Sequence, residues 1–249
     1  MLFVFVANLA RPAVTEADAL APTLGMTPYE TRLALAAGPP SVVLSTTDQN
    51  RANDVLGVLR SRGHGAHAFD DENFVASDGM TRADDFVLDA EGMRRTHGGE
   101  LLPYGDVYAI LRAVHDSTSE LERPAGSVVG DRQIVNSNAL RVVTKNEERE
   151  HVAYFFRRSG DKPWLLRERH ASYVGLGADR TPIAFSNFTR TITRMREASA
   201  MAVYDDRLAR RRVAERAGAE GGRSSREGMD LLAHLLAMTI ASQGGSPYR

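Results

Sequence analysis

Short apolar runs alternate with stretches of helical periodicity over the first seventy or so residues. The run 1–7 is dominated by Val and Phe and is too short for a helix, which is typical of a buried strand. Similar short runs occur at 41–45 and 66–69, and segments with helical spacing lie between the runs. The pattern therefore predicts the order strand, helix, helix, strand, helix, strand within residues 1–77.

The three helices of this segment carry start and stop signals. Thr15 begins the first helix and Gly25 ends it. Thr27 begins the second, with a capping box that Glu30 closes. Asp48 caps the third, whose apolar positions fall at i, i+3, i+4 and i+7. On the second helix, Tyr29, Leu33 and Ala36 fall on one face at helical spacing.

With these features the segment resembles the C-terminal domain of the bacterial ribosomal stalk protein, a fold shared in outline by the adaptors of Clp proteases. The residues that carry the likeness are Leu24, Gly25, Glu30, Pro39, Leu59 and Gly63. The resemblance implies a docking domain for protein partners rather than an enzyme. Stalk domains bind through lysines, whereas the comparable helices here offer only arginines, namely Arg32, Arg51, Arg60 and Arg62. The alternative is a generic α/β layer that packs against the rest of the chain.

Residues 84–203 predict a second, β-rich module, reached through a polar linker at 77–82. Short strands are expected over 85–88, 93–96, 101–114, 152–156 and 164–166, and a loop over 116–130. A closing helix is expected over 187–196, capped near Ser186 or Asn187, with Phe188, Ile192 and Met195 on its buried face. This arrangement weakly resembles a pleckstrin-homology-like half-barrel, which implies a second binding surface for a peptide, a lipid or a partner domain.

Aromatic residues and paired charges are dense between residues 164 and 208, and they allow two interpretations. One is a ligand pocket, formed around Arg167, Tyr173, Asn187 and Tyr204. The other is a packed aromatic core, formed by Trp164, Tyr173, Phe185 and Phe188. Of the two, we prefer the packed core.

Residues 204–249 predict a helical tail. A charged helix over 207–216 precedes a Gly-rich break at 221–225, and an apolar helix over 231–240 follows. The apolar face must be buried either against the body of the chain or against a second copy in a homo-oligomer. Because the net charge of the chain is only −1, a solvated helix is a better interpretation of the arginines than a nucleic-acid contact.

The composition removes several kinds of chemistry. The chain contains no cysteine, which excludes disulfides and cysteine-ligated zinc. Of the seven histidines, only His64 and His67 lie close together, and they make a weak metal signal beside a turn. No nucleophile elbow, dinucleotide fingerprint or phosphate loop is present, so we predict no catalytic residue, metal or cofactor.

The first apolar run lacks the basic region of a signal peptide, and no segment is long enough to cross a membrane, which predicts a cytoplasmic protein. The fold class expected overall is α+β. The function expected is that of a non-catalytic adaptor or regulatory protein that binds a protein partner. The alternative is a ligand sensor or an enzyme of unrecognised type, and nucleic-acid binding through residues 205–227 is a third hypothesis.

Overall fold

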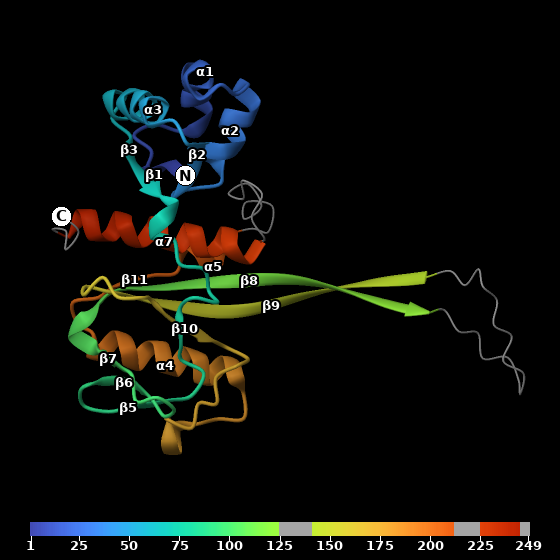
Figure 1. The fold of residues 1–249 in the computed structure, drawn as a ribbon, viewed down its shortest axis with the longest axis vertical. Coiled ribbons are helices and arrows are strands. Elements are labelled where there is room, and N and C mark those ends of the chain that lie inside the picture. Colours follow the sequence, from blue (N-terminus) through green and yellow to red (C-terminus); the bar gives the residue numbers. More distant parts are fainter. Residues whose placement is uncertain (125–140, 212–224, 245–249) are drawn as a thin grey trace, which may run out of the picture.

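The computed structural model describes the backbone of residues 1–124, 141–211 and 225–244. Side chains are described for the same residues except 117–124 and 141–148. The structure contains both helices and several separate sheets, which confirms the α+β class (Figure 1). Among the described residues, no helix is long and apolar enough to cross a membrane.

The N-terminal module has the predicted element order. Its elements are β1 (Leu2–Asn8), α1 (Ala13–Leu24), α2 (Pro28–Ala36), β2 (Ser41–Thr46), α3 (Gln49–Ser61) and β3 (Gly65–Asp70). The sheet order is β2-β1-β3, and both pairs are antiparallel. On β1, Val4 and Val6 face a core shared with the helices, whereas Phe3 and Phe5 face a second core on the other side of the sheet. Such alternation follows from the two-residue period of a strand.

Local signals set most of the helix ends in this module. Gly25 ends α1 in the left-handed conformation, with φ of 70°, and the capping box of Thr27 and Glu30 is complete. The Asp48 carboxylate accepts hydrogen bonds from two amides at the start of α3. The first helix, however, begins at Ala13 after Pro12, two residues before the predicted start at Thr15.

The apolar face of α2 that the sequence predicts is turned toward solvent. Tyr29 and Leu33 are 61% and 53% exposed, and Ala36 is exposed as well. The residues that α2 buries are Thr31 and Leu35. Helical spacing correctly groups Tyr29, Leu33 and Ala36 on one side, but it does not say which side meets the rest of the module.

The central part of the chain forms two further sheets. Strands β4 (Thr81–Arg82), β8 (Val107–Pro124), β9 (Arg141–Arg157), β10 (Trp164–Arg167) and β11 (Val203–Asp205) make a five-stranded sheet with the order β11-β8-β9-β10-β4. Strands β5 (Phe86–Leu88), β6 (Gly92–Arg95) and β7 (Leu101–Pro103) make a small antiparallel sheet. Helix α4 (Ala184–Ala198) buries Phe188, Ile192 and Met195, as predicted. Three short 3-10 helices complete this part, η1 (Asp71–Asn73), η2 (Tyr104–Asp106) and η3 (Gly177–Asp179).

Two predictions for this part of the chain are corrected. Residues 116–124 are not a loop, because β8 pairs with β9 in continuous register as far as Pro124, opposite Arg141. The remainder of the expected loop, 125–130, lies outside the described residues. Within the expected linker, Thr81 and Arg82 pair in parallel with β10 and so belong to the large sheet. In Figure 1 the β8–β9 ribbon extends well beyond the helices that cover the sheet.

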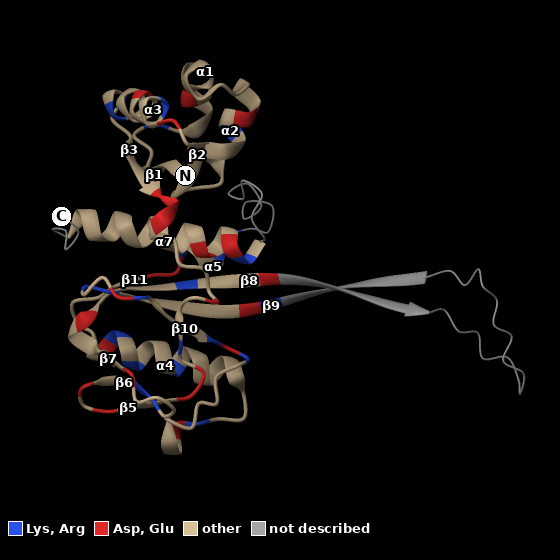
Figure 2. Cartoon of the chain, in the orientation of Figure 1, with Lys and Arg blue, Asp and Glu red and all other residues tan. Residues whose placement is uncertain are grey.

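The C-terminal helix is a central layer of the fold and not a tail. Helix α7 (Ser225–Gln243) lies between the N-terminal sheet and the β8–β9 ribbon (Figure 1). Apart from its charged start it is tan in Figure 2, and its residues from Gly228 to Ala237 are all buried. Its apolar residues pack with both neighbouring layers in one core, which includes Phe3, Phe69, Leu111 and Phe156. The face proposed for a second subunit is thus covered within the same chain.

A charged helix is expected over 207–216, but within the described residues, which here end at 211, the helix is shorter. Helix α5 (Arg207–Arg210) ends before Arg211, whose backbone is extended. Arg211 is buried and donates hydrogen bonds to the carbonyl oxygens of Gly38 and Pro40. Residues 212–224, which include most of the Gly-rich break, lie outside the described residues.

Candidate functional site

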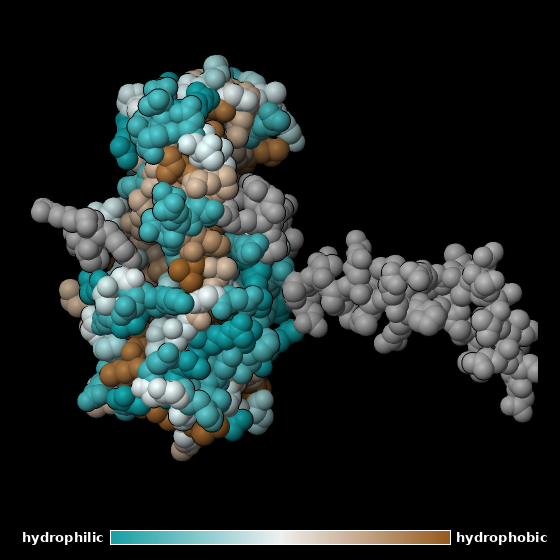
Figure 3. All heavy atoms as spheres, in the orientation of Figure 1, coloured by the Kyte–Doolittle hydropathy of each residue, from teal (hydrophilic) through white to brown (hydrophobic). Residues whose placement is uncertain are grey.

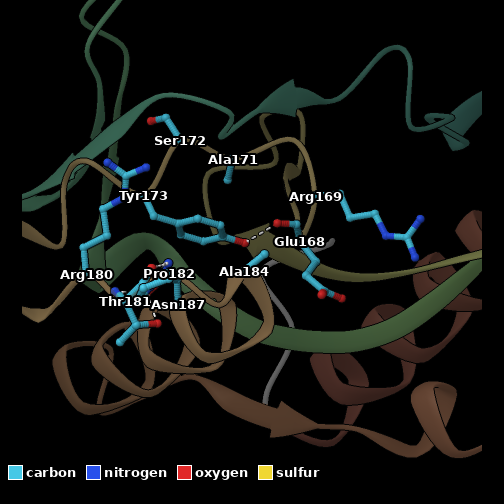
Figure 4. A pocket seen from close by; sticks show the side chains of 10 residues that line it. All are labelled: Glu168, Arg169, Ala171, Ser172, Tyr173, Arg180, Thr181, Pro182, Ala184 and Asn187. Carbon is cyan, nitrogen blue, oxygen red and sulfur yellow. Dashed lines mark hydrogen bonds between the residues drawn. The ribbon is translucent and has the colours of Figure 1, made fainter.

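A pocket of about 450 Å³ lies between the segment that follows β10 and the first turn of α4 (Figure 4). All of the residues that line it come from positions 168–187: Glu168, Arg169, Ala171, Ser172, Tyr173, Arg180, Thr181, Pro182, Ala184 and Asn187. Pockets that hold small ligands usually have volumes of roughly 300–1,000 Å³. The size of this pocket therefore suits a small molecule.

Tyr173 holds one wall of the pocket in an unusual backbone conformation. Its φ is 56°, a left-handed value that costs a bulky residue conformational energy. The side chain is buried, its ring meets Phe86 edge-on, and its hydroxyl donates a 2.8 Å hydrogen bond to the carbonyl oxygen of Glu168. Burial and the nearby charges of Glu168 and Glu150 raise the pKa of the phenol. The hydroxyl thus stays protonated and keeps the segment folded back on itself.

Asn187 fixes the opposite wall. Its Oδ1 accepts hydrogen bonds from the backbone N–H of Thr181 at 2.7 Å and from the Thr181 hydroxyl at 3.0 Å. Its Nδ2 donates to the Thr181 carbonyl oxygen at 2.7 Å. Asn187 therefore does not cap α4 as predicted; the N-cap is Ile183, which makes no side-chain capping bond. The amide thus orders the approach to the helix.

Some of the charged side chains around the pocket form hydrogen bonds or ion pairs with other residues. Glu168 Oε2 accepts a 3.4 Å hydrogen bond from the backbone N–H of His151, and its carboxylate points away from the Tyr173 ring in Figure 4. Asp179 forms ion pairs with Arg190 and Arg194. Arg180 extends along the side of the pocket where Ser172 lies (Figure 4).

Two of the four residues predicted for a pocket are brought together, and two are not. Tyr173 and Asn187 line it, whereas Arg167 is buried behind it and donates a 3.0 Å hydrogen bond to Asp84. Tyr204 lies on β11, with the guanidinium of Arg196 4.0 Å from its ring centre. Among the lining residues that sequence reasoning missed are the polar residues Ser172, Arg180 and Thr181. For Arg180 and Thr181 the one signal was a polar stretch between Gly177 and the closing helix.

The packed-core interpretation holds for most of the aromatic residues. Trp164, Tyr173 and Phe188 are buried in a single cluster. Phe185 is 42% exposed and lies beside the His151 ring, with ring centres 5.1 Å apart. The pocket and the aromatic core therefore coexist, and Tyr173 belongs to both.

The arginines predicted as a docking surface have different roles. Arg51 and Arg60 donate hydrogen bonds to the carbonyl oxygens of Thr23 and Ala66 and so tie α3 to neighbouring segments. Arg62 forms an ion pair with Glu16. Arg32 alone accompanies an exposed apolar side chain, with its guanidinium 5.4 Å from the Tyr29 ring centre.

The histidine pair near the third strand does not form a metal site. His64 Nδ1 accepts a hydrogen bond from the Ala10 N–H, and its Nε2 lies 3.2 Å from a carboxylate oxygen of Glu16. His67 stacks on Phe5. The Arg62 hydrogen bond lowers the pKa of Glu16 to about 2, and His64 adds to this effect while burial opposes it. Among the described residues, no group of three or more side chains is placed to hold a metal ion.

A buried polar cluster that sequence reasoning missed joins three parts of the chain. The Asp230 carboxylate, on α7, accepts hydrogen bonds from the N–H and hydroxyl of Ser77 and from the hydroxyl of Tyr154. His115 Nε2 lies 3.3 Å from the same carboxylate. Burial raises the pKa of Asp230, but the bonds from His115, Ser77 and Tyr154 outweigh this and lower it overall. All four side chains are at most 4% exposed, so the cluster is a structural junction.

Comparison with known proteins finds no relative of this chain. The chain matches no protein-family model, no characterised protein and no solved structure. The likeness to the stalk-protein domain and to a pleckstrin-homology-like half-barrel accordingly stays a prediction from the sequence.

Proposed function

We propose that this chain is a non-catalytic adaptor that binds a protein partner through helix α2 of its N-terminal module. The observation that carries the proposal is the outward face of α2, where Tyr29 and Leu33 are more than half exposed. The two residues lie at i and i+4 and are therefore neighbours on the helix surface. Figure 3 shows brown, hydrophobic spheres at the surface of the N-terminal module in the region of α2.

The outward face has the composition of a protein-binding site. Tyrosine and arginine are over-represented among the residues that contribute most to protein–protein binding. Arg32 lies against the Tyr29 ring, a contact that holds both side chains in place and leaves a positive charge beside an apolar surface. The partner that fits this face has an apolar patch bordered by a carboxylate.

The inward face of α2 already anchors the helix. Leu35 is 1% exposed and belongs to the core of the module, and Thr31 is completely buried. The capping box of Thr27 and Glu30 fixes the first turn of α2, and it does not involve Tyr29 or Leu33. Tyr29 and Leu33 are thus not needed to hold the helix in place, which supports a role in binding.

Affinity capture with surface variants tests the proposal. We expect the full-length chain to retain a discrete protein partner from a native lysate, and Tyr29→Ala with Leu33→Ala to lose it. Arg60→Ala, which changes α3, is the matched control and is expected to retain the partner. Deletion of residues 1–77 is a poor test, because Phe3, Phe5 and Phe69 share a core with α7. Equal capture by the double variant would contradict the proposal.

A second candidate function is that of a ligand sensor or an enzyme of unrecognised type. The pocket between β10 and α4 supports it through its volume of about 450 Å³ and the polar side chains within its mixed lining. Native mass spectrometry of the purified chain tests for a small molecule that copurifies. A bound mass that disappears on denaturation is expected under this function, and the partner capture described above does not depend on it.

For the compartment we propose the cytoplasm. Residues 3–6 are completely buried in the central strand of the N-terminal sheet, which supports a role for the apolar N-terminal run in the fold. The absence of cysteine from the sequence agrees with a reducing compartment. Fractionation of cells that express the chain tests the assignment, and recovery in a membrane or exported fraction would contradict it.

A further inference from the structure

We propose that the pocket between β10 and α4 binds a small organic ligand through an oxyanion, a carboxylate or a phosphate, that pairs with Arg180. The inference rests on the second candidate function and specifies its ligand class. Arginine suits this task because its planar guanidinium donates two parallel hydrogen bonds to a carboxylate or phosphate.

One cation at the pocket is available to an anion. Of the two arginines in the lining, Arg169 points away from the pocket in Figure 4, and Arg180 extends along it. The single acidic residue of the lining, Glu168, turns its carboxylate toward the His151 N–H. The other acidic residues nearby are also engaged: Asp179 with Arg190 and Arg194, and Glu150 with His170. The Arg180 guanidinium, by contrast, has no ion pair or side-chain hydrogen bond among the residues that the structure describes.

The remaining lining residues define the rest of the ligand. Ser172 contributes a hydroxyl group that can donate a hydrogen bond to an oxyanion, whereas the Thr181 hydroxyl already donates to Asn187 and helps to hold the wall. Ala171, Pro182 and Ala184 contribute apolar surface. The combination fits a compact molecule with an oxyanion at one end and a small apolar body, of which benzoate is a simple example.

The pocket walls are ordered before any ligand arrives. Three hydrogen bonds between Asn187 and Thr181 fix the residue before Pro182 against α4, and the Tyr173 hydroxyl closes the turn that begins at Glu168. A binding site that is already ordered loses less conformational entropy on binding, which favours affinity for a small ligand. The cost of the left-handed backbone at Tyr173 is also consistent with a segment shaped for binding.

Chemical-shift titration of the full-length chain by NMR tests the proposal. The probes are benzoate, its neutral analogue benzamide, and inorganic phosphate, each at low salt and up to about 10 mM, a range that detects millimolar dissociation constants. We expect saturable shifts confined to residues 168–187 with benzoate or phosphate, and much smaller shifts with benzamide. A response to benzoate alone identifies a carboxylate ligand, and a response to phosphate alone identifies a phosphate ligand.

Two variants make the result specific. Arg180→Ala is expected to weaken binding about tenfold or more, since it removes a charge-assisted contact. Arg158→Ala, which removes another exposed guanidinium just beyond the end of β9, is expected to change nothing. Equal shifts with benzamide, or unchanged binding by Arg180→Ala, would overturn the anion assignment and leave a ligand pocket. If none of the probes shifts residues 168–187, the anion assignment is overturned, and the copurification measurement alone then decides whether the pocket has a ligand.

Discussion

Tyr154 on β9 donates a 2.7 Å hydrogen bond to the carboxylate of Asp230 on α7, and neither side chain is exposed to solvent. The same carboxylate accepts two hydrogen bonds from Ser77, which follows the N-terminal module in the chain. A single buried charge thus connects the segment after the first module, the long ribbon and the C-terminal helix. Buried charges are tolerated where hydrogen bonds satisfy them, as happens here.

Asp230→Asn is expected to destabilise the whole fold. The amide would present N–H groups to the donors of Ser77 and Tyr154, and at least one buried donor would lose its acceptor. We expect the free energy of unfolding to fall by about 2–4 kcal/mol, measured by urea denaturation at neutral pH. Asp161→Asn, at an exposed turn, is the control and should change it by less than about 0.5 kcal/mol. A loss in Asp230→Asn as small as the control's would show that the cluster is not a structural junction.

His234 is expected to make stability depend on pH. Burial among the rings of Phe69, Phe74 and Phe156 lowers its pKa to about 4, although the Val75 carbonyl and Asp230 act in the opposite direction. Between pH 6.5 and pH 4 the unfolded chain therefore binds a proton that the folded chain does not. Stability falls as the pH falls through this window, by on the order of 3 kcal/mol when the window is complete.

His234→Gln removes this titration and keeps a donor for the Val75 carbonyl oxygen. We expect the variant to lose most of the dependence of unfolding free energy on pH between 6.5 and 4, measured by urea denaturation at several pH values. His97→Gln, whose parent side chain is 85% exposed, should keep that dependence. An unchanged slope in His234→Gln would mean that other groups are responsible.

Truncation of a side chain is expected to lower stability on the inward face of α2 and to have little effect on the outward face. Leu35→Ala removes a core side chain and should lower the unfolding free energy by about 2–4 kcal/mol. Leu33→Ala, on the exposed face, should change it by less than about 0.5 kcal/mol. Chemical denaturation of the two variants checks this contrast. Equal losses would imply that the outward face is packed and unavailable to a partner.

Gly175 is expected to be intolerant of a side chain. A Cβ at this position would lie 2.1 Å from the carbonyl oxygen of Phe86, which forces the segment that carries the pocket away from β5. Gly175→Ala should therefore cost about 2 kcal/mol or more in unfolding free energy. Gly105→Ala, where a Cβ would meet nothing within 4 Å, should have little effect. A neutral Gly175→Ala, measured in the same denaturation experiment, would contradict the close approach.

Much of the N-terminal module is determined by residues close together in the sequence. The capping box at Thr27 and Glu30 and the glycine stop at Gly25 act within one helical turn, so they are visible in the sequence and appear unchanged in the fold. Strand β1 follows from its short run of Val and Phe, and the buried positions of α4 follow from helical periodicity, for the same reason. Likewise, the composition alone excludes disulfides.

The tertiary structure decided what depends on contacts between distant residues. Periodicity grouped Tyr29 with Leu33, but only the packing of α2 through Leu35 turned that group toward solvent. The leucines of α7 required a burial site, and only the fold placed them between the N-terminal sheet and the β8–β9 ribbon, both of which precede the helix by many residues in sequence. The pocket depends in the same way on a distant contact, since the Tyr173 ring that forms one wall packs edge-on against Phe86 of β5. Burial depends on the tertiary packing of the whole chain. Local sequence patterns therefore predict the helices and strands, but they do not predict which elements pack together.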